Sequence, residues 1–339
     1  MSTASQGRTQ SGFHWPRGGA ALIAAAAAVL LPAAAPPACA QDYPLRAVRL
    51  IVPFAPGGQV DTVARIASAA LSQALGRQFV VDNRPGAGGN LGAGIAVKAE
   101  ADGHTLIMVS SSFAINPSLS AHTPYDPRRS FVPVHLVATA PNVLLVHPSL
   151  PPRSVKELVA FVRARPGKVA YASSGVGTPP HLAGELFASM AKLKFVHVPY
   201  KGGGPATVDL ITGEVSLMFL GMAPAMPHVA SGRLRPLATT GLRRASALPK
   251  VPTVAESGFP KFEIVNWIGL LAPAGTATGI VERLHGALQK GLASPDGMAR
   301  LAKLGLDRAG LGPSEYRAFL DAEVDKWAGV VKLSGAANR

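Results

Sequence analysis

Residues 48–76 read VRLIVPFAPGGQVDTVARIASAALSQALG and predict a β-strand, a glycine turn and an α-helix in succession. The β-branched and apolar run from Val48 to Phe54 is typical of a buried parallel strand. From Val63 to Leu75 apolar residues recur every three or four positions, and Gly76 supplies a helix stop. A strand that leads through a short turn into a helix is the first half of a βαβ unit, so this stretch indicates an α/β fold.

The same alternation continues along the rest of the chain. Further strands are predicted at 79–81, 105–109, 142–147, 169–172, 195–198, 215–219, 237–240 and 263–271. Further helices are predicted at 90–98, 154–165, 181–190, 205–211, 280–292, 298–304 and 314–332. Neither a fixed-period repeat nor a long linker is visible, so the strands themselves must join the parts of the fold.

We therefore expect two lobes, each with a mainly parallel sheet flanked by helices. Lobe 1 is predicted to comprise residues 41–142 together with 266–339, and lobe 2 residues 143–265. A C-terminal helical block that returns to lobe 1 makes the chain cross between the lobes twice. The prediction is therefore a hinge of two segments.

The first forty residues predict a cleaved secretory signal. Arg8 and Arg17 precede an apolar run from 18 to 31, and Ala38-Cys39-Ala40 provides an AxA cleavage site. Pro32 ends the run at 14 residues, short of the roughly 20 that a membrane-spanning helix needs. We expect cleavage after Ala40, which removes the single cysteine and with it disulfide and thiol chemistry. A lipid anchor on Cys39 is the alternative, although the residues before it lack the leucine of a lipobox.

The charge of the exported part favours small anions over nucleic acid as ligands. Residues 41–339 keep 31 basic and 19 acidic side chains, a net charge of +12. Such a surface attracts anions, although solubility alone would also explain it. The basic residues are scattered, with no run longer than Arg128-Arg129 or Arg243-Arg244 and no aromatic-studded motif, so nucleic-acid binding is not expected.

Four glycine-rich loops each follow a predicted strand and precede a predicted helix, at 56–58, 84–89, 173–178 and 201–204. The start of a helix presents unpaired backbone NH groups and the positive end of the helix dipole, which together bind carboxylate or phosphate. Any one such loop is explained as well by a tight turn. Because loops at the carboxyl ends of parallel strands converge, the four together predict an anion-binding cleft.

Candidate ligand contacts follow from these loops and their edges. They are Gly57, Gly58, Gln59, Asp61, Ser173, Ser174, Thr178, His181, Lys201 and Gly202. Asp61 fits a helix N-cap equally well, and both roles can hold. His181 belongs to no HExxH motif and to no close cluster of His and Asp residues in the sequence, so we interpret it as a structural or ligand-contacting residue. No metal, nucleotide or other cofactor is expected, because HExxH, GxGxxG and P-loop patterns are all absent. The GxSxG motif is absent too, so Ser173 and Ser174 are interpreted as hydroxyl donors to a ligand and not as nucleophiles.

Motifs that carry a family resemblance extend along nearly the whole exported chain. They are VPFAPGGQVD at 52–61, DNRPGAGGN at 82–90, AINPSL at 114–119, YASSG at 171–175, HLAGELF at 181–187, VPYKG at 198–202, LP at 248–249, VPTVAE at 251–256 and LAPAGT at 271–276. In this order and spacing they resemble the Bug-type substrate-binding receptors of tripartite tricarboxylate transporters. The resemblance implies a type II periplasmic-binding fold and a carboxylate ligand held in part through waters. It carries the ligand site onto Gly57, Gly58, Ser111, Ser112, Ser173, Ser174, Thr178, His181 and Lys201.

The expected function is therefore that of a periplasmic, non-enzymatic receptor, monomeric, whose lobes close on a small carboxylate. The resemblance implies delivery of that solute to an integral membrane permease formed by other chains. A ligand sensor for a signalling system is the first alternative. A secreted hydrolase is the second alternative. It requires either a nucleophile paired with a base or a metal cluster, and the sequence shows no motif for either.

Overall fold

The computed structural model describes residues 12, 43–120 and 122–334. The predicted cleavage site and Cys39 lie outside these residues. From Tyr43 onward the chain alternates strands and helices, as the sequence predicts. The strands are β1 (Val48–Val52), β2 (Phe79–Asn83), β3 (Thr105–Ser110), β4 (Phe131–Val146), β5 (Ala170–Ser173), β6 (Val196–Pro199), β7 (Leu217–Gly221), β8 (Arg235–Thr239), β9 (Val265–Pro273) and β10 (Asp307–Leu311).

The helices lie between these strands and at the C-terminal end of the described chain. They are α1 (Gln59–Leu75), α2 (Asn90–Ala96), α3 (Ser112–Leu119), α4 (Val155–Arg163), α5 (Pro179–Ala191), α6 (Gly203–Thr212), α7 (Met222–Ala230), α8 (Thr278–Ala293), α9 (Pro295–Lys303) and α10 (Pro313–Ser334), with a 3-10 turn η1 at Ala87–Gly89. The predicted cap of α4 is present, because Glu157 N donates to Ser154 Oγ at 3.2 Å. In a regular capping box the Glu157 carboxylate would accept from the NH group of the N-cap residue, Ser154. Here Glu157 Oε2 accepts from the preceding residue instead, from Arg153 N at 2.9 Å.

All ten strands belong to one hydrogen-bonded sheet with the order β2-β1-β3-β9-β4-β7-β5-β6, and β8 and β10 also pair with β4. Parallel pairs occur at its two ends, where β1 pairs with β2 and β3, and β5 pairs with β6 and β7. The middle is antiparallel, because β9 runs against β3 and β4, and β4 runs against β7, β8 and β10. Each half of the sheet therefore combines the predicted parallel strands with antiparallel strands next to β4.

Strand β4 connects the two halves of the sheet. Its residues 131–141 pair with β9, and its residues 142–146 pair with β7. The chain returns to the first half between β8 and β9, so it passes between the halves twice. The sequence predicted only 142–147 as a strand here, because Pro133 and Pro141 interrupt the earlier apolar run. Helices α3 and α7 were missed for a related reason, since each contains an internal proline.

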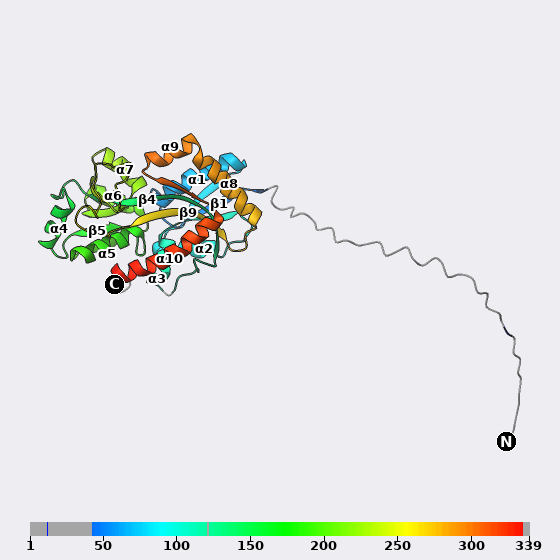
Figure 1. Ribbon diagram of the computed structural model, residues 1–339, viewed down its shortest axis with the longest axis horizontal. Coiled ribbons are helices and arrows are strands. Elements are labelled where there is room, and N and C mark those ends of the chain that lie inside the picture. The colour runs from blue at the N-terminus through cyan, green and yellow to red at the C-terminus, as the bar shows by residue number, and fades with distance from the viewer. Residues whose placement is uncertain (1–11, 13–42, 121, 335–339) are drawn as a thin grey trace, which may run out of the picture. The chain divides into compact units, whose positions relative to one another are not determined.

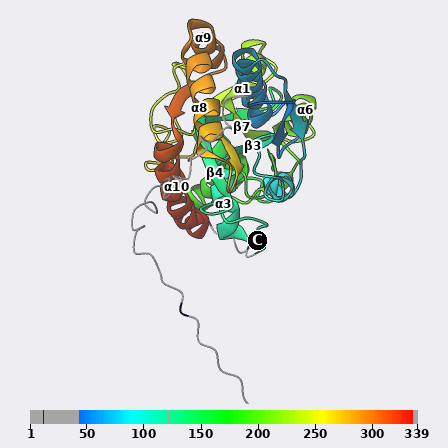
Figure 2. The ribbon, with the colours of Figure 1, turned by 90° about the vertical axis from the view of Figure 1, so that its right-hand side faces the viewer.

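Two layers of helices cover the two faces of the sheet. Helices α1, α6, α7, α8 and α9 cover one face, and α2, α3, α4, α5 and α10 cover the other (Figure 1). The view at right angles shows α1 beside α8 and α10 beside α3 (Figure 2). The side chains of β1 alternate between the two faces. Leu50 and Val52 pack against the layer that contains α1 and α8, and Ile51 packs against the layer that contains α3 and α10.

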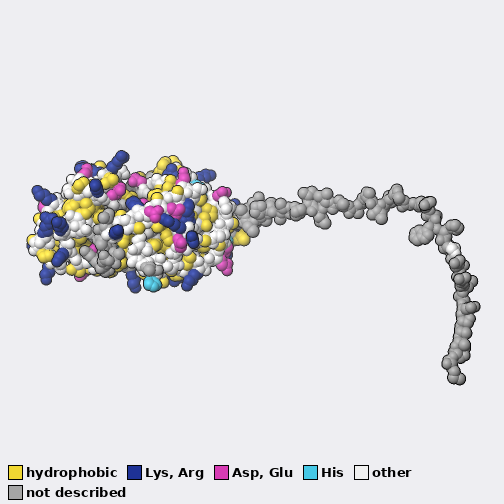
Figure 3. All heavy atoms as spheres, turned by 60° about the horizontal axis from the view of Figure 1, so that its bottom comes forward, with side chains coloured by type: hydrophobic (Ala, Val, Ile, Leu, Met, Phe, Trp, Pro, Cys, Tyr) yellow, Lys and Arg dark blue, Asp and Glu magenta, His cyan; other side chains and the backbone are white. Residues whose placement is uncertain are grey.

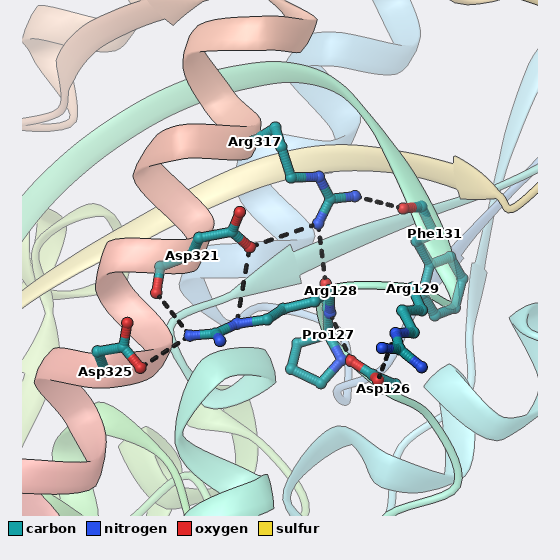
Figure 4. A network of polar contacts seen from close by, with 8 residues as sticks. All are labelled: Asp126, Pro127, Arg128, Arg129, Phe131, Arg317, Asp321 and Asp325. Carbon is teal, nitrogen blue, oxygen red and sulfur yellow. Dashed lines mark hydrogen bonds and ion pairs between the residues drawn. The ribbon is translucent and has the colours of Figure 1, made fainter.

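Helix α10 is tied to the loop that enters β4. Arg317 donates to the carbonyl oxygen of Phe131 at 2.6 Å, and Arg128 donates to Asp325 at 2.7 Å and to the carbonyl oxygen of Asp321 at 3.2 Å (Figure 4). Two arginines and two aspartates thus connect residues almost 200 positions apart in the sequence. The contacts fix the C-terminal helix against the central strand.

Two histidines, the fully buried His135 and the partly buried His197, predict that acid weakens the fold. Burial, with help from His285 and Arg308, lowers the pKa of His135 to about 3, and burial with help from His181 lowers the pKa of His197 to about 4. Below about pH 6.5 the unfolded chain takes up protons at both histidines, whereas the folded chain does not until it reaches these lower values. The free energy of unfolding therefore falls as the pH decreases through this window. Urea midpoints measured from about pH 7.5 to about pH 4.5 test it.

The replacement His135→Gln provides the control for this acid effect. It removes one of the histidines whose pKa is lowered, so the decline in the urea midpoint should be shallower than in the unchanged protein. A decline of equal steepness in both proteins would contradict the assignment to His135.

Candidate functional site

The N-termini of α1 and α6 meet across the two halves of the sheet. Helix α1 starts after Gly58 in the first half, and α6 starts after Gly202 in the second. A Cβ atom added to Gly58 would lie 3.3 Å from the backbone nitrogen of Gly203, and one added to Gly57 would lie 3.7 Å from Cα of Gly204. Backbone therefore packs on backbone at this point. The positive ends of two helix dipoles border the same space.

Further glycines line the same seam between the halves. Ala55 N donates to the carbonyl oxygen of Lys201 at 3.0 Å, and a Cβ atom on Gly202 would lie 2.8 Å from Ala55 N. A Cβ atom on Gly88 would overlap the carbonyl oxygen of Val176. The structure thus brings together the four glycine-rich loops that the sequence singled out.

The main pocket lies beside this seam, contains about 420 Å³ of empty space and is partly open to solvent. Its first-half and central walls are Phe54, Gly58, Gln59, Val60, Ser110, Asn142 and Asn266. Its second-half walls are Ser174, Thr178, Pro179, Pro180, Gly203, Leu220, Gly221 and Pro224. Every described lining residue is uncharged. An anion in this pocket would therefore be stabilised by the helix starts and not by lysine or arginine side chains.

A second pocket opens next to the first and shares Phe54 and Ser174 with it. It contains about 910 Å³ of empty space, part of it open to solvent, and is bordered by the glycine loop at 86–90 and by Lys201. Lys201 is exposed. Lys201 therefore borders this second, outer pocket, where its ammonium group can attract an approaching anion.

Asp61 holds the first glycine loop in place. Its buried carboxylate accepts hydrogen bonds from Gly57 N, from Asn83 Nδ2 and from Arg65, each at 3.0 Å. Burial alone would raise the pKa of Asp61, but the bonds from Arg65, Gly57 and Asn83 outweigh it and keep the pKa below its ordinary value. The ionised side chain reaches back from the first turn of α1 to the NH group of Gly57, one residue before the one that the acid of a regular capping box binds.

The predicted serines have different surroundings. Ser174 lines both pockets. Ser111 is fully buried, where its Oγ donates to Asn266 Oδ1 at 3.0 Å and accepts from Trp267 N at 3.1 Å. Ser112 Oγ lies 3.0 Å from Ser110 Oγ, and it is Ser110 that lines the main pocket. The hydroxyl of Ser111 thus joins the end of β3 to β9, whereas that of Ser112 contacts only the last residue of β3.

Ser173, Thr178 and His181 belong to a buried cluster behind the second-half loop. Ser173 Oγ lies 2.7 Å from His197 Nε2, and the ring of His197 stacks on that of His181 with 4.6 Å between centroids. Thr178 lines the pocket, and its Oγ1 donates to the carbonyl oxygen of Gly175 at 2.6 Å. This cluster fixes the shape of the loop that carries Ser174.

Comparison with known proteins gives the family. The model of the tripartite tricarboxylate transporter family receptors matches residues 63–335. The chain belongs to this receptor family. Relatives include Protein BugT of Bordetella pertussis, 39% identical over 88% of this chain and 93% of its own length. A protein of Pseudomonas sp. strain P51 encoded between tcbD and tcbE is 40% identical over 84% of this chain and 85% of its own length.

Solved structures of this receptor family confirm the fold class. Rpa4515 of R. palustris, solved with adipate, is 37% identical with a TM-score of 0.84 over 86% of this chain and 98% of its own. MatC of Rhodopseudomonas palustris, solved with malate, is 32% identical with a TM-score of 0.82 over 85% of this chain and 100% of its own. BugD, described as a periplasmic binding protein, is 34% identical with a TM-score of 0.84 over 87% and 99% of the two chains. The expected type II periplasmic-binding fold is therefore present.

Three polar residues that line the main pocket of this receptor were not predicted from the sequence. Asn142 and Asn266 lie in apolar strands, and Ser110 ends a third strand. A side-chain amide inside an otherwise apolar strand was the available signal, because a buried polar group needs a partner. Among residues 43–120 and 122–334, no helix is long and apolar enough to cross a membrane. The described part of the receptor likewise contains no group of three or more His, Cys, Asp or Glu that could hold a metal ion.

Proposed function

We propose that this receptor binds a small carboxylate in the pocket between the two halves of its sheet and passes it to an integral membrane permease made of other chains. The observation that carries the proposal is the convergence of the α1 and α6 starts on an uncharged pocket. An anion placed there is stabilised by both helix dipoles and by free NH groups. The adipate and malate bound to two structural relatives support the same ligand class.

The proposal includes closure of two lobes around the ligand. Lobe 1 is residues 41–142 with 266–339, and lobe 2 is residues 143–265, with the hinge in β4 and in the segment before β9. The support is the change of pairing partner at Asn142, from β9 to β7. Like partial charges face each other where the α1 and α6 starts meet, so an anion between them favours closure. We place the mature protein in the periplasm, as a monomer that performs no catalysis.

The proposed ligand contacts fall into three groups by position. Gly58, Gln59, Ser174 and Thr178 line the main pocket, and Lys201 borders the outer one. Gly57 and Gly202 form the seam that lets the helix starts approach. Asp61, Ser111, Ser112, Ser173 and His181 hold the loops in shape, and their effect on a ligand is indirect.

A thermal-shift screen of the mature protein against mono-, di- and tricarboxylates tests the proposal. A carboxylate present at a hundred times its Kd adds about 2.7 kcal/mol to the free energy of unfolding, which raises Tm by about 4 °C in a protein of this size. Amides and methyl esters that replace the carboxylate should give no shift. The variant Gly58→Val should lose the shift, because its side chain would meet the backbone of Gly203.

The screen contradicts the proposal if no carboxylate raises Tm while circular dichroism shows a folded protein and mass spectrometry shows no co-purified ligand. A Tm increase that Gly58→Val retains in full would place the binding site elsewhere.

A further inference from the structure

Two side-chain amides of the pocket have no hydrogen-bond partner among the described residues. Gln59 is 7% exposed and Asn142 is fully buried, and both line the main pocket. The unpartnered atoms are Nε2 and Oε1 of Gln59 and Nδ2 and Oδ1 of Asn142. A buried polar group without a partner is costly, so such groups in a native protein require an explanation. Their position in the pocket indicates that a guest satisfies them.

The two amides lie in the same corner, next to Gly221. Asn142 is the direct partner of Gly221 in the antiparallel β4–β7 ladder. Directly paired residues place their side chains on the same face about 5 Å apart. The Gln59 side chain occupies the position of the missing Gly221 side chain, since a Cβ atom added there would lie 2.8 Å from Cδ and 3.0 Å from Cβ of Gln59. Gln59 thus extends from the start of α1 to the end of β7, beside Asn142.

The absence of charged side chains from this corner disfavours a charged end group on the ligand. No Asp, Glu, Lys, Arg or His is found among the described residues that line the pocket. The carboxylate at the helix starts is offset by backbone dipoles. A second carboxylate, or an ammonium group, in the amide corner would be buried without a counter-charge.

The hydrogen-bonding capacity of the corner narrows the end group further. Whichever way each amide is turned, it presents one NH₂ donor and one oxygen acceptor. A carboxylate only accepts, so it would leave both amide oxygens unpartnered. An ammonium group only donates, so it would leave both NH₂ groups unpartnered. A primary carboxamide has two NH donors and one acceptor oxygen, so it can partner both amides. A hydroxyl has one donor and two acceptor lone pairs, so it can partner both NH₂ groups and one amide oxygen.

We propose that Gln59 and Asn142 select a monocarboxylate whose far end is an uncharged group that both donates and accepts hydrogen bonds. The ligand class is thus an acid with a carboxamide or a hydroxyl at the end opposite its carboxylate. This inference rests on the proposed function, because the carboxylate is the end that the helix starts hold.

Isothermal titration with ligands that differ only at the far end tests the inference. The probes are adipamic acid, 6-hydroxyhexanoate, adipate, 6-aminohexanoate and hexanoate, with the corresponding four-carbon series, at a pH where both adipate carboxyls are ionised. We expect the carboxamide or the hydroxy acid to bind about tenfold tighter than the dicarboxylate, the amino acid and the plain acid of equal length, since one hydrogen bond to a buried group is worth about that factor.

Two variants of Gln59 assign the preference to this residue. Gln59→Met keeps the length of the side chain and removes its polar atoms, so the advantage of the carboxamide over hexanoate should shrink about tenfold. Gln59→Glu adds a negative charge of nearly the same shape, so 6-aminohexanoate should gain about tenfold relative to adipamic acid. Gln73→Met is the matched control, because Gln73 is an exposed glutamine on the same helix.

The outcomes separate this inference from the function on which it rests. Binding of carboxylates with equal Kd for every end group would overturn the inference and leave the proposed function intact. A preference for the dicarboxylate, or one that Gln59→Met leaves unchanged, would also overturn it. Failure of every carboxylate to bind would overturn both. The end-group comparison in the unchanged protein stands even if a variant fails to fold.

Discussion

Replacing Gly204 by alanine is expected to weaken carboxylate binding about a hundredfold, close to 2.7 kcal/mol, without unfolding either half of the protein. Gly204 is the second residue of α6, and its backbone angle is one that alanine adopts freely. An added Cβ atom would overlap the carbonyl oxygen of Pro56 across the seam. Backbone cannot rotate away as a flexible side chain would. The methyl group therefore opposes the closed form alone.

The measurement is Kd by isothermal titration, together with Tm of the ligand-free protein. Alanine is a better helix former than glycine by about 0.5–1 kcal/mol, so Tm of the open form should stay level or rise. Gly329→Ala is the matched control, because Gly329 is also helical and an added Cβ atom meets nothing within 4 Å. Unchanged affinity in Gly204→Ala would show that the seam between Gly204 and Pro56 is not part of the ligand-bound form.

The glycine loops were predictable from the sequence because they depend on local chemistry. A strand, a turn with Gly57 and Gly58 and an amphipathic helix follow one another within 30 residues, so their pattern is visible without knowledge of distant contacts. The position of the loops at one edge follows from the parallel connections. The pairing of Gly57 with Gly204 required the structure, because it joins residues about 150 positions apart.

The polar side chains of the pocket were less predictable. Three consecutive serines, Ser110 to Ser112, have equal standing in the sequence, and only the direction of each side chain decides which one lines the pocket. Asn142 was hidden in a long strand whose first part contains two prolines. Asn142 lines the pocket because its ladder partner Gly221 has no side chain, and the side chain of Gln59 packs against that glycine. Such a corner arises from three distant segments, and no local pattern encodes it.

The largest loss of stability is expected at Glu323, a buried acid in α10. Its Oε2 accepts from the indole nitrogens of Trp267, at 2.8 Å, and Trp327, at 2.7 Å. Its Oε1 forms an ion pair with Lys326 at 2.9 Å. Both tryptophans are at most 1% exposed, and Glu323 is 6% exposed. One carboxylate therefore satisfies two buried donors and joins the last helix to strand β9.

Glu323→Ala should lower the free energy of unfolding by about 3–5 kcal/mol, because it leaves two buried NH groups without an acceptor and opens a cavity. Urea denaturation measures the loss. Glu323→Gln keeps an acceptor oxygen of the same shape and should recover part of it. Asp325→Ala removes only the exposed pair with Arg128, which is worth at most about 1 kcal/mol. Equal losses in Glu323→Ala and Asp325→Ala would mean that α10 is held by its apolar face alone, with the buried carboxylate contributing nothing.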